Sequence, residues 1–354
     1  MGTNVSLALK DANPEARIVA LDNLRRRGSE LNLGRLRARG VEFVHGDVRS
    51  RADLLAAGQS VDLVLDCSAE PAVLSGYGED RPDYVVDTNL NGTVNCLELV
   101  RETGADLLFL STSRVYPLKG INAIATHDGG TRFELSQDQR LPGLSSRGIG
   151  ETFSLIGPRS LYGATKLCSE LLIQEYAAMY GVRAVVNRCS VLAGPLQMAK
   201  VDQGVFTLWV VRHHFGWPLS YIGWGGEGKQ VRDVLHIDDL TQLIGLQLSR
   251  FDELAGQTFN VGGGVDNSLS LLETTGICRA ITGHNVPIAA APETRAADIK
   301  WYITDNQRVT DATGWSPRAT PRDILISILE WVQMAEVELK PIFSPPKTNK
   351  SGGP

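Results

Sequence analysis

The sequence lacks the features that mark membrane, secreted and nucleic-acid-binding proteins. Its 354 residues contain no apolar run near the roughly 20 residues of a membrane-spanning helix, and no basic segment followed by an apolar stretch opens it. The 35 Lys and Arg against 40 Asp and Glu give a net charge of −5 and no basic excess. We therefore expect a soluble, cytoplasmic protein whose partners include neither nucleic acid nor a membrane.

Cysteine and histidine are scarce and scattered. The five cysteines are odd in number, widely spaced and without a CxxC pair, and the six histidines are dispersed along the chain. This pattern argues against a disulfide framework and against a structural zinc site, so we expect no bound metal.

Short apolar runs alternate with helical stretches, which predicts a parallel α/β sheet. Near-continuous apolar strands between helices indicate a sheet covered on both faces, which is typical of a doubly wound fold. The expected strands are 17–23, 41–47, 61–69, 105–112, 183–192 and 256–264, and the expected helices are 29–39, 50–57, 81–103 and 161–180.

The regular alternation weakens after residue 192, where Gly, Pro and Trp become more frequent. We expect a nucleotide-binding domain made of 1–192 plus 228–265 and a smaller substrate-binding lobe made of 193–227 plus 266–340. Residues 341–354 are rich in Pro, Gly and Lys, a composition that predicts a disordered tail.

Polar residues come after two of the predicted strands, at the edge where ligands bind in parallel sheets. Asp22, followed by Asn23, can accept hydrogen bonds from an adenosine ribose and repel a 2′-phosphate, which favours NAD over NADP. The neighbouring Arg25, Arg26 and Arg27 weaken that inference, and the alternative is an ordinary strand-to-loop turn. Asp47 and Val48 form the kind of pair that brackets an adenine ring.

The stretch "SLYGATK" places Tyr162 and Lys166 four residues apart at the start of an expected helix, hence on one face. A nearby ammonium lowers the pKa of a phenol, which then accepts a proton from an alcohol as its carbon loses hydride. Ser111 and Thr112 end a predicted strand fifty residues earlier, where a hydroxyl can contact the same substrate oxygen. A chance match is the alternative, and the three-part arrangement makes it the weaker one.

These residues resemble the extended short-chain dehydrogenase/reductase family, whose members oxidise, epimerise or dehydrate nucleotide-linked sugars. The resemblance covers nearly the whole chain and implies a Rossmann-like domain that binds NAD. Matching positions are Asp22-Asn23-Leu24, Asp47, Asn89 with Gly92 and Thr93, Arg232 in "RDVLHIDD", and Asn260 with Gly262 and Gly263. Arg232 would contact the nucleotide diphosphate; the alternative is a surface ion pair with Asp233.

The two residues after Thr112 indicate the branch of the family. Dehydratase members carry an Asp-Glu pair there, whereas this chain has Ser113 and Arg114 and so lacks their acid. Strings such as "DNLRRRGSELNLGRL", "VDQGVF" and "VDNSLSLLE" resemble the branch that inverts C2 of CDP-linked sugars. The resemblance implies that Tyr162 is the base, that Lys166 keeps it ionised and binds the nicotinamide ribose, and that Thr112 polarises the substrate oxygen.

The resemblance also implies substrate contacts and an assembly. Asp202, Gln203, Arg295 and Asp298 would lie at the sugar or nucleotide pocket, although Arg295 and Asp298 fit a solvated loop equally well. Helices 81–103 and 161–180 pair between subunits in this family, so we expect a homodimer or homotetramer. Two alternatives stay open: a C4-epimerase or dehydrogenase acting on another nucleotide sugar, and a non-catalytic binding protein with a degenerate Rossmann fold.

The opening "MGTNVSLALK" matches the family only from the last glycine of its glycine-rich loop, which is Gly2, and from the helix behind it. The first strand and the earlier glycines of the loop that receives the diphosphate have no counterpart. We expect that the start codon is assigned too far downstream and that the sheet lacks its first strand.

Overall fold

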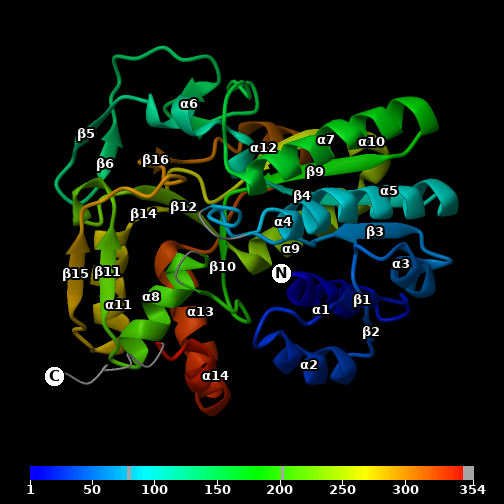
Figure 1. Cartoon of the computed structure of the whole chain (residues 1–354), viewed down its shortest axis with the longest axis horizontal. Helices are drawn as coiled ribbons and strands as arrows, with labels where there is room; N and C mark the ends of the chain where they lie inside the picture. The colour runs from blue at the N-terminus through cyan, green and yellow to red at the C-terminus, as the bar shows by residue number, and fades with distance from the viewer. Residues whose placement is uncertain (78–80, 201–202, 346–354) are drawn as a thin grey trace.

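The computed structural model describes residues 1–77, 81–200 and 203–345. Its central sheet has the order β13–β9–β4–β3, and β3, β4 and β9 are labelled at the right of Figure 1. All the pairings within it are parallel, so the carboxyl ends of the strands lie at one edge. The strands are β3 (Leu63–Asp66), β4 (Asp106–Thr112), β9 (Ala184–Cys189) and β13 (Thr258–Val261).

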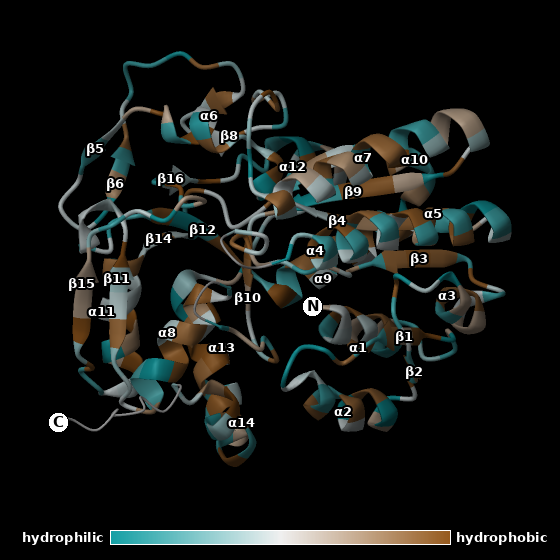
Figure 2. Ribbon diagram, viewed as in Figure 1, coloured by the Kyte–Doolittle hydropathy of each residue, from teal (hydrophilic) through white to brown (hydrophobic). Residues whose placement is uncertain are grey.

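Helices cover both faces of this sheet. Alternate residues of each strand point to opposite sides, and apolar residues lie on both sides. Phe109 packs with α5 (Gly92–Thr103) and α7 (Leu161–Tyr180), whereas Leu108 packs with α9 (Ile237–Ser249). The brown ribbon of β3 and β9 in Figure 2 marks the apolar residues between these layers. The predicted doubly wound Rossmann-like fold is confirmed.

The strands nearest the N-terminus form a sheet of their own. β1 (Val19–Asp22) and β2 (Glu42–His45) pair in parallel, and β1 has no second strand partner within the described ranges. The helix before them, α1 (Gly2–Ala12), packs against β1 and α9 and buries Val5. The described hydrogen bonds therefore divide the predicted strands between two parallel sheets. The helices of this part are η1 (Ser29–Asn32), α2 (Leu33–Ala38) and α3 (Arg51–Gly58).

A long excursion separates β4 from α7 and carries two short hairpins. It contains η3 (Ser113–Val115), α6 (Leu118–Asn122), β5 (Thr126–Asp128), β6 (Phe133–Leu135), β7 (Leu144–Ser145) and β8 (Gly148–Ile149). Other short helices of the nucleotide-binding side are α4 (Asp83–Val86), the π-helical η2 (Asp87–Asn91), α10 (Phe251–Leu254) and α12 (Gln307–Thr313).

A second core lies on the other side of the molecule, at the left of Figure 1. It joins residues of both segments assigned to the substrate lobe, among them Trp209, Leu269 and Ile328. The domain limits themselves stay a prediction. The elements of this part are β10 (Val191–Ala193), α8 (Val205–His214), β11 (Leu219–Ile222), η4 (Trp224–Gly226), β12 (Val231–His236), β14 (Ser268–Ser270), α11 (Leu271–Thr282), β15 (Ile288–Ala291), β16 (Trp301–Tyr302), α13 (Pro321–Met334) and α14 (Glu336–Phe343).

The predicted tail begins too early. Residues 341–343 belong to α14, and Phe343 is buried, with its ring 6.4 Å from that of Trp331. The apolar contact outweighs the Pro and Lys composition that suggested disorder from residue 341. Residues 346–354 lie outside the described ranges.

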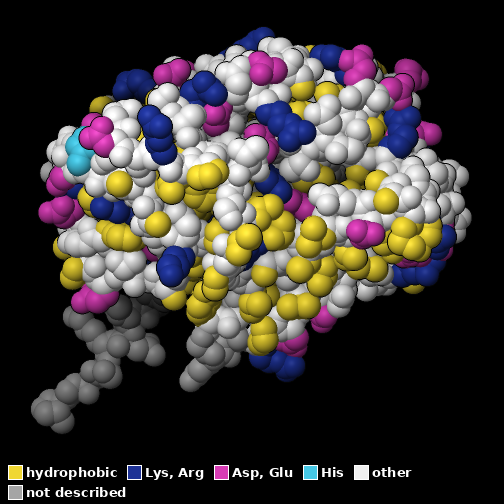
Figure 3. Space-filling view, turned by 90° about the horizontal axis from the view of Figure 1, so that it is seen from above, with side chains coloured by type: hydrophobic (Ala, Val, Ile, Leu, Met, Phe, Trp, Pro, Cys, Tyr) yellow, Lys and Arg dark blue, Asp and Glu magenta, His cyan; other side chains and the backbone are white. Residues whose placement is uncertain are grey.

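Basic and acidic side chains are interspersed over the face that Figure 3 shows, with apolar side chains between them. None of the helices within the described ranges has the length and apolarity that a bilayer crossing requires.

Candidate active site

The predicted pair Thr112 and Tyr162 comes together at the carboxyl end of β4. Thr112 is the last residue of β4, and Tyr162 lies in the first turn of α7, whose N-cap Ser160 accepts a hydrogen bond from Gly163 N at 3.3 Å. A Cβ on Gly163 would lie 2.1 Å from the carbonyl oxygen of Arg114. Glycine at position 163 therefore lets the first turn of α7 rest directly on η3, the turn that follows β4.

Three neighbours from three elements act on the Tyr162 phenol. Burial raises the pKa of Tyr162, and the hydrogen bond with the Thr112 hydroxyl and the positive charge of Arg114 act in the opposite direction. The thiol of Cys189, at the end of β9, has its pKa raised by burial to about 12 and is therefore neutral near pH 7. The phenol is thus a half-buried acid beside one hydroxyl and one cation.

Lys166 lies one turn further along α7, with only 2% of its surface exposed. Its ammonium donates a hydrogen bond to Ser68 O at 3.1 Å and lies 4.3 Å from the ring centroid of Phe109. Burial lowers the pKa of Lys166, and the negative charge of Asp66 opposes that effect. The ammonium is therefore held between the loop after β3 and Phe109 in the middle of β4.

Ser111 does not face the site, which corrects its predicted substrate role. Its hydroxyl donates a hydrogen bond to the Glu170 carboxylate at 2.5 Å, and both residues are buried. Adjacent residues of a strand point to opposite faces, so Ser111 and Thr112 cannot both contact one ligand. Glu170 also forms a buried ion pair with Arg188 of β9, at 2.7 Å.

Sequence reasoning missed this Glu170–Arg188 pair. Two signals were available: Glu170 comes four residues after Lys166 on the same helix face, and Arg188 interrupts an apolar strand. A charged residue in such a strand needs a buried partner.

The ends of β1 and β2 hold the predicted adenosine-side residues. Asp22 is exposed, and one oxygen of its carboxylate accepts a hydrogen bond from Leu24 N at 2.7 Å. The second carboxylate oxygen stays open to solvent. Asn23 donates to Asp47 at 2.9 Å, and Arg49 forms a 2.7 Å ion pair with the same carboxylate. The Arg49 hydrogen bond holds the pKa of Asp47 well below its usual range, against the effect of burial. Asp47 therefore stays ionised but is already engaged by the protein.

The other predicted cofactor residues, Asn89, Val48 and Gly2, contact neighbouring parts of the protein. Asn89 is 1% exposed. Its side chain accepts a hydrogen bond from Glu70 N at 2.7 Å and donates hydrogen bonds to Glu70 O and to Thr165 Oγ1. It therefore fastens the loop after β3 to α7. Val48 packs against α5 at Gly92, where an added Cβ would lie 2.8 Å from a Val48 methyl. Gly2 begins α1 and has its nearest outside neighbour, Cys67 Cβ, at 3.9 Å.

The donors at this edge fit a dinucleotide. Asp22 offers an exposed carboxylate at the end of β1, and Lys166 holds an ammonium beside the loop that follows β3. The 11-residue helix α1 begins at Gly2 without a side-chain cap, so the backbone N–H groups of its first turn remain available to an anion. A ribose, a diphosphate and a nicotinamide ribose need these three kinds of group.

Arg232 and Asp298 form an ion pair. Arg232 donates to Asp298 at 3.1 Å and to Ile299 O at 2.5 Å. The ion pair suggested with Asp233 is wrong, because Asp233 accepts hydrogen bonds from Ser190 and Gly264 N instead. Burial lowers the pKa of Arg232 to about 10; Asp298 opposes this effect and nearby Arg114 adds to it.

The remaining predicted substrate residues are less central. Gln203 accepts a hydrogen bond from Arg26, which joins the start of α8 to the loop after β1. Arg295 is half-buried and its carbonyl accepts Asp298 N at 3.1 Å. Asp202 lies outside the described residues.

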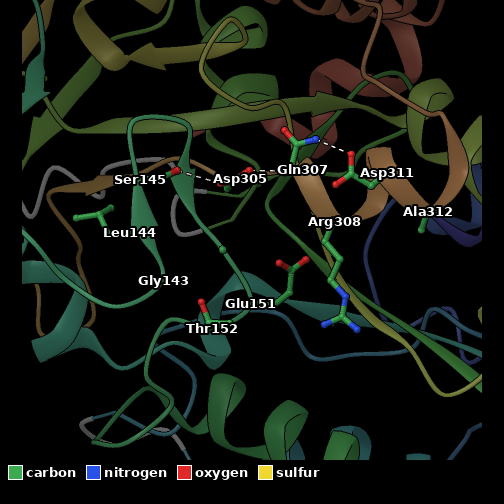
Figure 4. Close-up of a pocket in the computed structure, with 11 residues that line it drawn as sticks. Gly143, Leu144, Ser145, Glu151, Thr152, Asp305, Gln307, Arg308, Asp311 and Ala312 are labelled. Atoms are coloured by element: carbon green, nitrogen blue, oxygen red, sulfur yellow. Dashed lines mark hydrogen bonds between the residues drawn. The ribbon is translucent and has the colours of Figure 1, made fainter.

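A separate cavity lies away from the residues around Tyr162. It has a volume of about 610 Å³ between the β7–β8 hairpin and α12, and Glu151 and Arg308 project into it from opposite sides (Figure 4). None of its lining residues belongs to the constellation around Tyr162. In the described part of the chain, no group of three or more His, Cys, Asp or Glu side chains is placed to hold a metal ion.

Replacing Asp22 by Ser should narrow the preference for NAD over NADP by roughly 5- to 10-fold. The physical reason is that the exposed carboxylate repels a 2′-phosphate by about 1 kcal/mol in water. Calorimetric titration of the variant with both nucleotides measures the ratio of the two dissociation constants. Asp62→Asn, at the amino end of β3, is the matched control and should leave the ratio unchanged. An unaltered ratio in the Asp22 variant would mean that this carboxylate does not face the ribose.

Comparison with known proteins shows what this chain is similar to. Residues 1–262 match the model of the NAD dependent epimerase/dehydratase family. The chain is 29% identical to CDP-paratose 2-epimerase of Salmonella typhi over 328 residues, covering 89% of this chain and 91% of that protein. It is 27% identical to dTDP-glucose 4,6-dehydratase of Mycolicibacterium smegmatis over 350 residues, covering 97% and 93%.

A solved structure agrees with this pattern. The crystal structure of dTDP-glucose 4,6-dehydratase from Streptomyces venezuelae, with NAD bound, superposes with a TM-score of 0.73. The two chains are 26% identical, and the match covers 96% of each. Epimerases and dehydratases are thus both similar to this chain across almost its full length.

Proposed function

Because this chain belongs to the NAD dependent epimerase/dehydratase family, whose cofactor is NAD, we propose that it inverts C2 of a CDP-linked sugar such as CDP-paratose. One observation carries the choice of an epimerase over a dehydratase. The residue two positions after Thr112 is Arg114, whose charge acts on Tyr162, where the dehydratases that the chain resembles carry a carboxylic acid. A guanidinium does not protonate a leaving hydroxyl near neutral pH.

The chain's own residues then perform a proton relay. The ionised phenol of Tyr162 accepts the proton of the sugar C2 hydroxyl. The keto-sugar then rotates in the site to present its opposite face, and the same phenol returns the proton. When bound, NAD supplies the acceptor and then the donor of the hydride. Thr112 holds the substrate oxygen beside the phenol, and Lys166, on α7, binds the nicotinamide ribose. No net oxidation results, since each group returns to its first state.

The remaining assignments belong to the same proposal. Asp22 would bind the adenosine ribose, the first turn of α1 the cofactor diphosphate, and Arg232 the substrate diphosphate. The protein would act in the cytoplasm as a homodimer through α5 and α7, because α7 exposes Leu171 at 54%, Met179 at 66% and Tyr180 at 53%. Sedimentation of the purified chain tests the dimer, and a single monomeric species would contradict it.

A labelled substrate tests the reaction itself. CDP-paratose carrying deuterium at C2 is incubated with the protein and NAD, and the products are followed by NMR. We expect inversion at C2 with the deuterium retained, because the hydride stays on the cofactor between the two steps. A product inverted at C4 or loss of the label to water would each contradict the proposal. A 4-keto-6-deoxy product formed from dTDP-glucose, which has the C6 hydroxyl that CDP-paratose lacks, would contradict it too. Parallel incubations with UDP-, GDP- and dTDP-sugars identify the substrate if CDP-paratose is not converted.

A further inference from the structure

Resting on the proposed function, in which Lys166 binds the nicotinamide ribose, we infer that Asp66 is a positioning residue for that ammonium. It acts through Ser68, whose carbonyl group Lys166 contacts. Asp66 is the last residue of β3 and is 3% exposed. A carboxylate buried to this degree needs hydrogen-bond donors or an opposite charge, because water does not reach it. The hydrogen bonds of Asp66 lead directly to Lys166.

Asp66 fixes the turn that follows β3. The amide of Ser68 donates to Asp66 Oδ1 at 2.9 Å, and the Ser68 hydroxyl donates to the same oxygen at 2.6 Å. Two residues further along, the backbone N–H and carbonyl oxygen of Glu70 both bond to the Asn89 side chain. The carbonyl group of Ser68 lies between these two anchors, so they set its direction.

The Ser68 carbonyl group in turn directs the Lys166 ammonium. Its oxygen accepts a hydrogen bond from Lys166 Nζ at 3.1 Å, and the ring centroid of Phe109 lies 4.3 Å from the same nitrogen. An ammonium carries three N–H donors, so the bond to Ser68 leaves two of them for the hydroxyls of a ribose. Because a lysine side chain is long and flexible, a fixed acceptor holds its end in one place.

The second carboxylate oxygen of Asp66 has a weak partner. Thr93 Oγ1 lies 3.3 Å from Asp66 Oδ2, but its single proton has a nearer acceptor in Asn89 O at 2.8 Å. The positive charge of Lys166, linked to Asp66 through Ser68, therefore compensates the buried carboxylate. Burial raises the pKa of the thiols that also act on Lys166, which are neutral near pH 7: Cys67, Cys96 and Cys189.

Two ligands separate this role from a general effect on the structure. The full chain is titrated calorimetrically with NAD and with ADP, which has the adenosine and the diphosphate but no nicotinamide ribose. D66A should weaken NAD binding by about tenfold and leave ADP binding unchanged, because the ammonium no longer points to the ribose hydroxyls. D66N, whose amide oxygen accepts the same two bonds from Ser68, should keep the wild-type ratio of the two dissociation constants.

K166M shows whether Asp66 acts through the lysine. It should weaken NAD binding and spare ADP binding, and D66A added to K166M should weaken NAD binding no further. An equal loss for NAD and ADP in D66A, or a further loss in the double variant, overturns the inference and leaves Asp66 a structural role only.

If D66A does not fold, S68A provides the same comparison, since it removes the hydroxyl bond to Asp66 and keeps the carbonyl group. We expect S68A to weaken NAD binding by about threefold without affecting ADP binding, and an unchanged ratio would overturn the inference. A wild-type ratio in K166M would overturn the ribose assignment and the inference with it. The titrations need no turnover, so an incorrect substrate assignment leaves their outcome readable.

Discussion

Tyr162→Phe should lower kcat by about 10³-fold or more while the protein stays folded and still binds NAD. The phenol is the group that accepts and returns the proton in the proposed reaction, and general acid–base catalysis contributes about 10²–10⁴-fold. Phenylalanine lacks only the hydroxyl oxygen, so the packing of the ring is kept. The variant also removes the acid whose pKa the site adjusts, so the acidic limb of the remaining rate should flatten.

Tyr180→Phe is the matched control, because it makes the same change on the same helix at a side chain that is 53% exposed. It should leave kcat unaltered. Steady-state kinetics with the identified substrate, together with a thermal melt of each variant, separates lost chemistry from lost structure. If Tyr162→Phe keeps more than a tenth of the wild-type kcat, the phenol is not the proton acceptor.

The sequence predicts those parts of the site that local signals encode. Periodicity places Tyr162 and Lys166 on one helix face, and an apolar run ending in hydroxyls places Thr112 at a sheet edge. Asp22 is found in the same way, as a carboxylate ending a strand. Each of these signals lies within one element, where side-chain direction is set by the backbone.

Ser111 shows where such signals mislead. Composition alone makes two adjacent hydroxyls equivalent, and only the strand alternation separates the one facing Tyr162 from the one facing Glu170. The alternation rule was available from sequence, but the identity of the buried partner was not. Glu170 is 59 positions away in the chain.

Long-range pairings account for the rest of what sequence could not supply. Arg114 donates to a carbonyl 183 positions later, and Arg232 pairs with Asp298, 66 positions later. Which of several arginines meets which carboxylate depends on how β12, η3 and the loop before β16 pack together. Sequence reasoning therefore offered Asp233 as the neighbour of Arg232, whereas the structure pairs Arg232 with Asp298.

The buried ion pair behind the site leads to the second large prediction. Glu170→Gln should lower the free energy of unfolding by about 3–5 kcal/mol, because it leaves the Arg188 guanidinium buried without its counter-charge. Glu170 is 1% exposed and Arg188 is 6% exposed. Ser111 and Tyr116 also join this network, at 2.5 Å from Glu170 and 3.3 Å from Arg188. Urea denaturation of the purified variant measures the loss.

The double variant Glu170→Met with Arg188→Met separates the lost charge from the lost packing. Removing both partners should restore most of the stability, since apolar side chains of similar volume replace a buried pair at little cost. Glu42→Gln, at an ion pair more than half exposed on both sides, is the control and should leave the unfolding free energy unchanged. A Glu170→Gln variant as stable as that control would show that Arg188 finds another partner.

The same pair also connects stability with catalysis. Glu170 lies one turn beyond Lys166 on α7, and Arg188 and Ser111 tie that helix to β9 and β4. The double variant should therefore fold yet lose part of its kcat, because α7 is free to shift and carries Tyr162 away from Thr112. A double variant with wild-type kcat would mean that the contact of Gly163 with Arg114 O holds α7 in place without the ion pair.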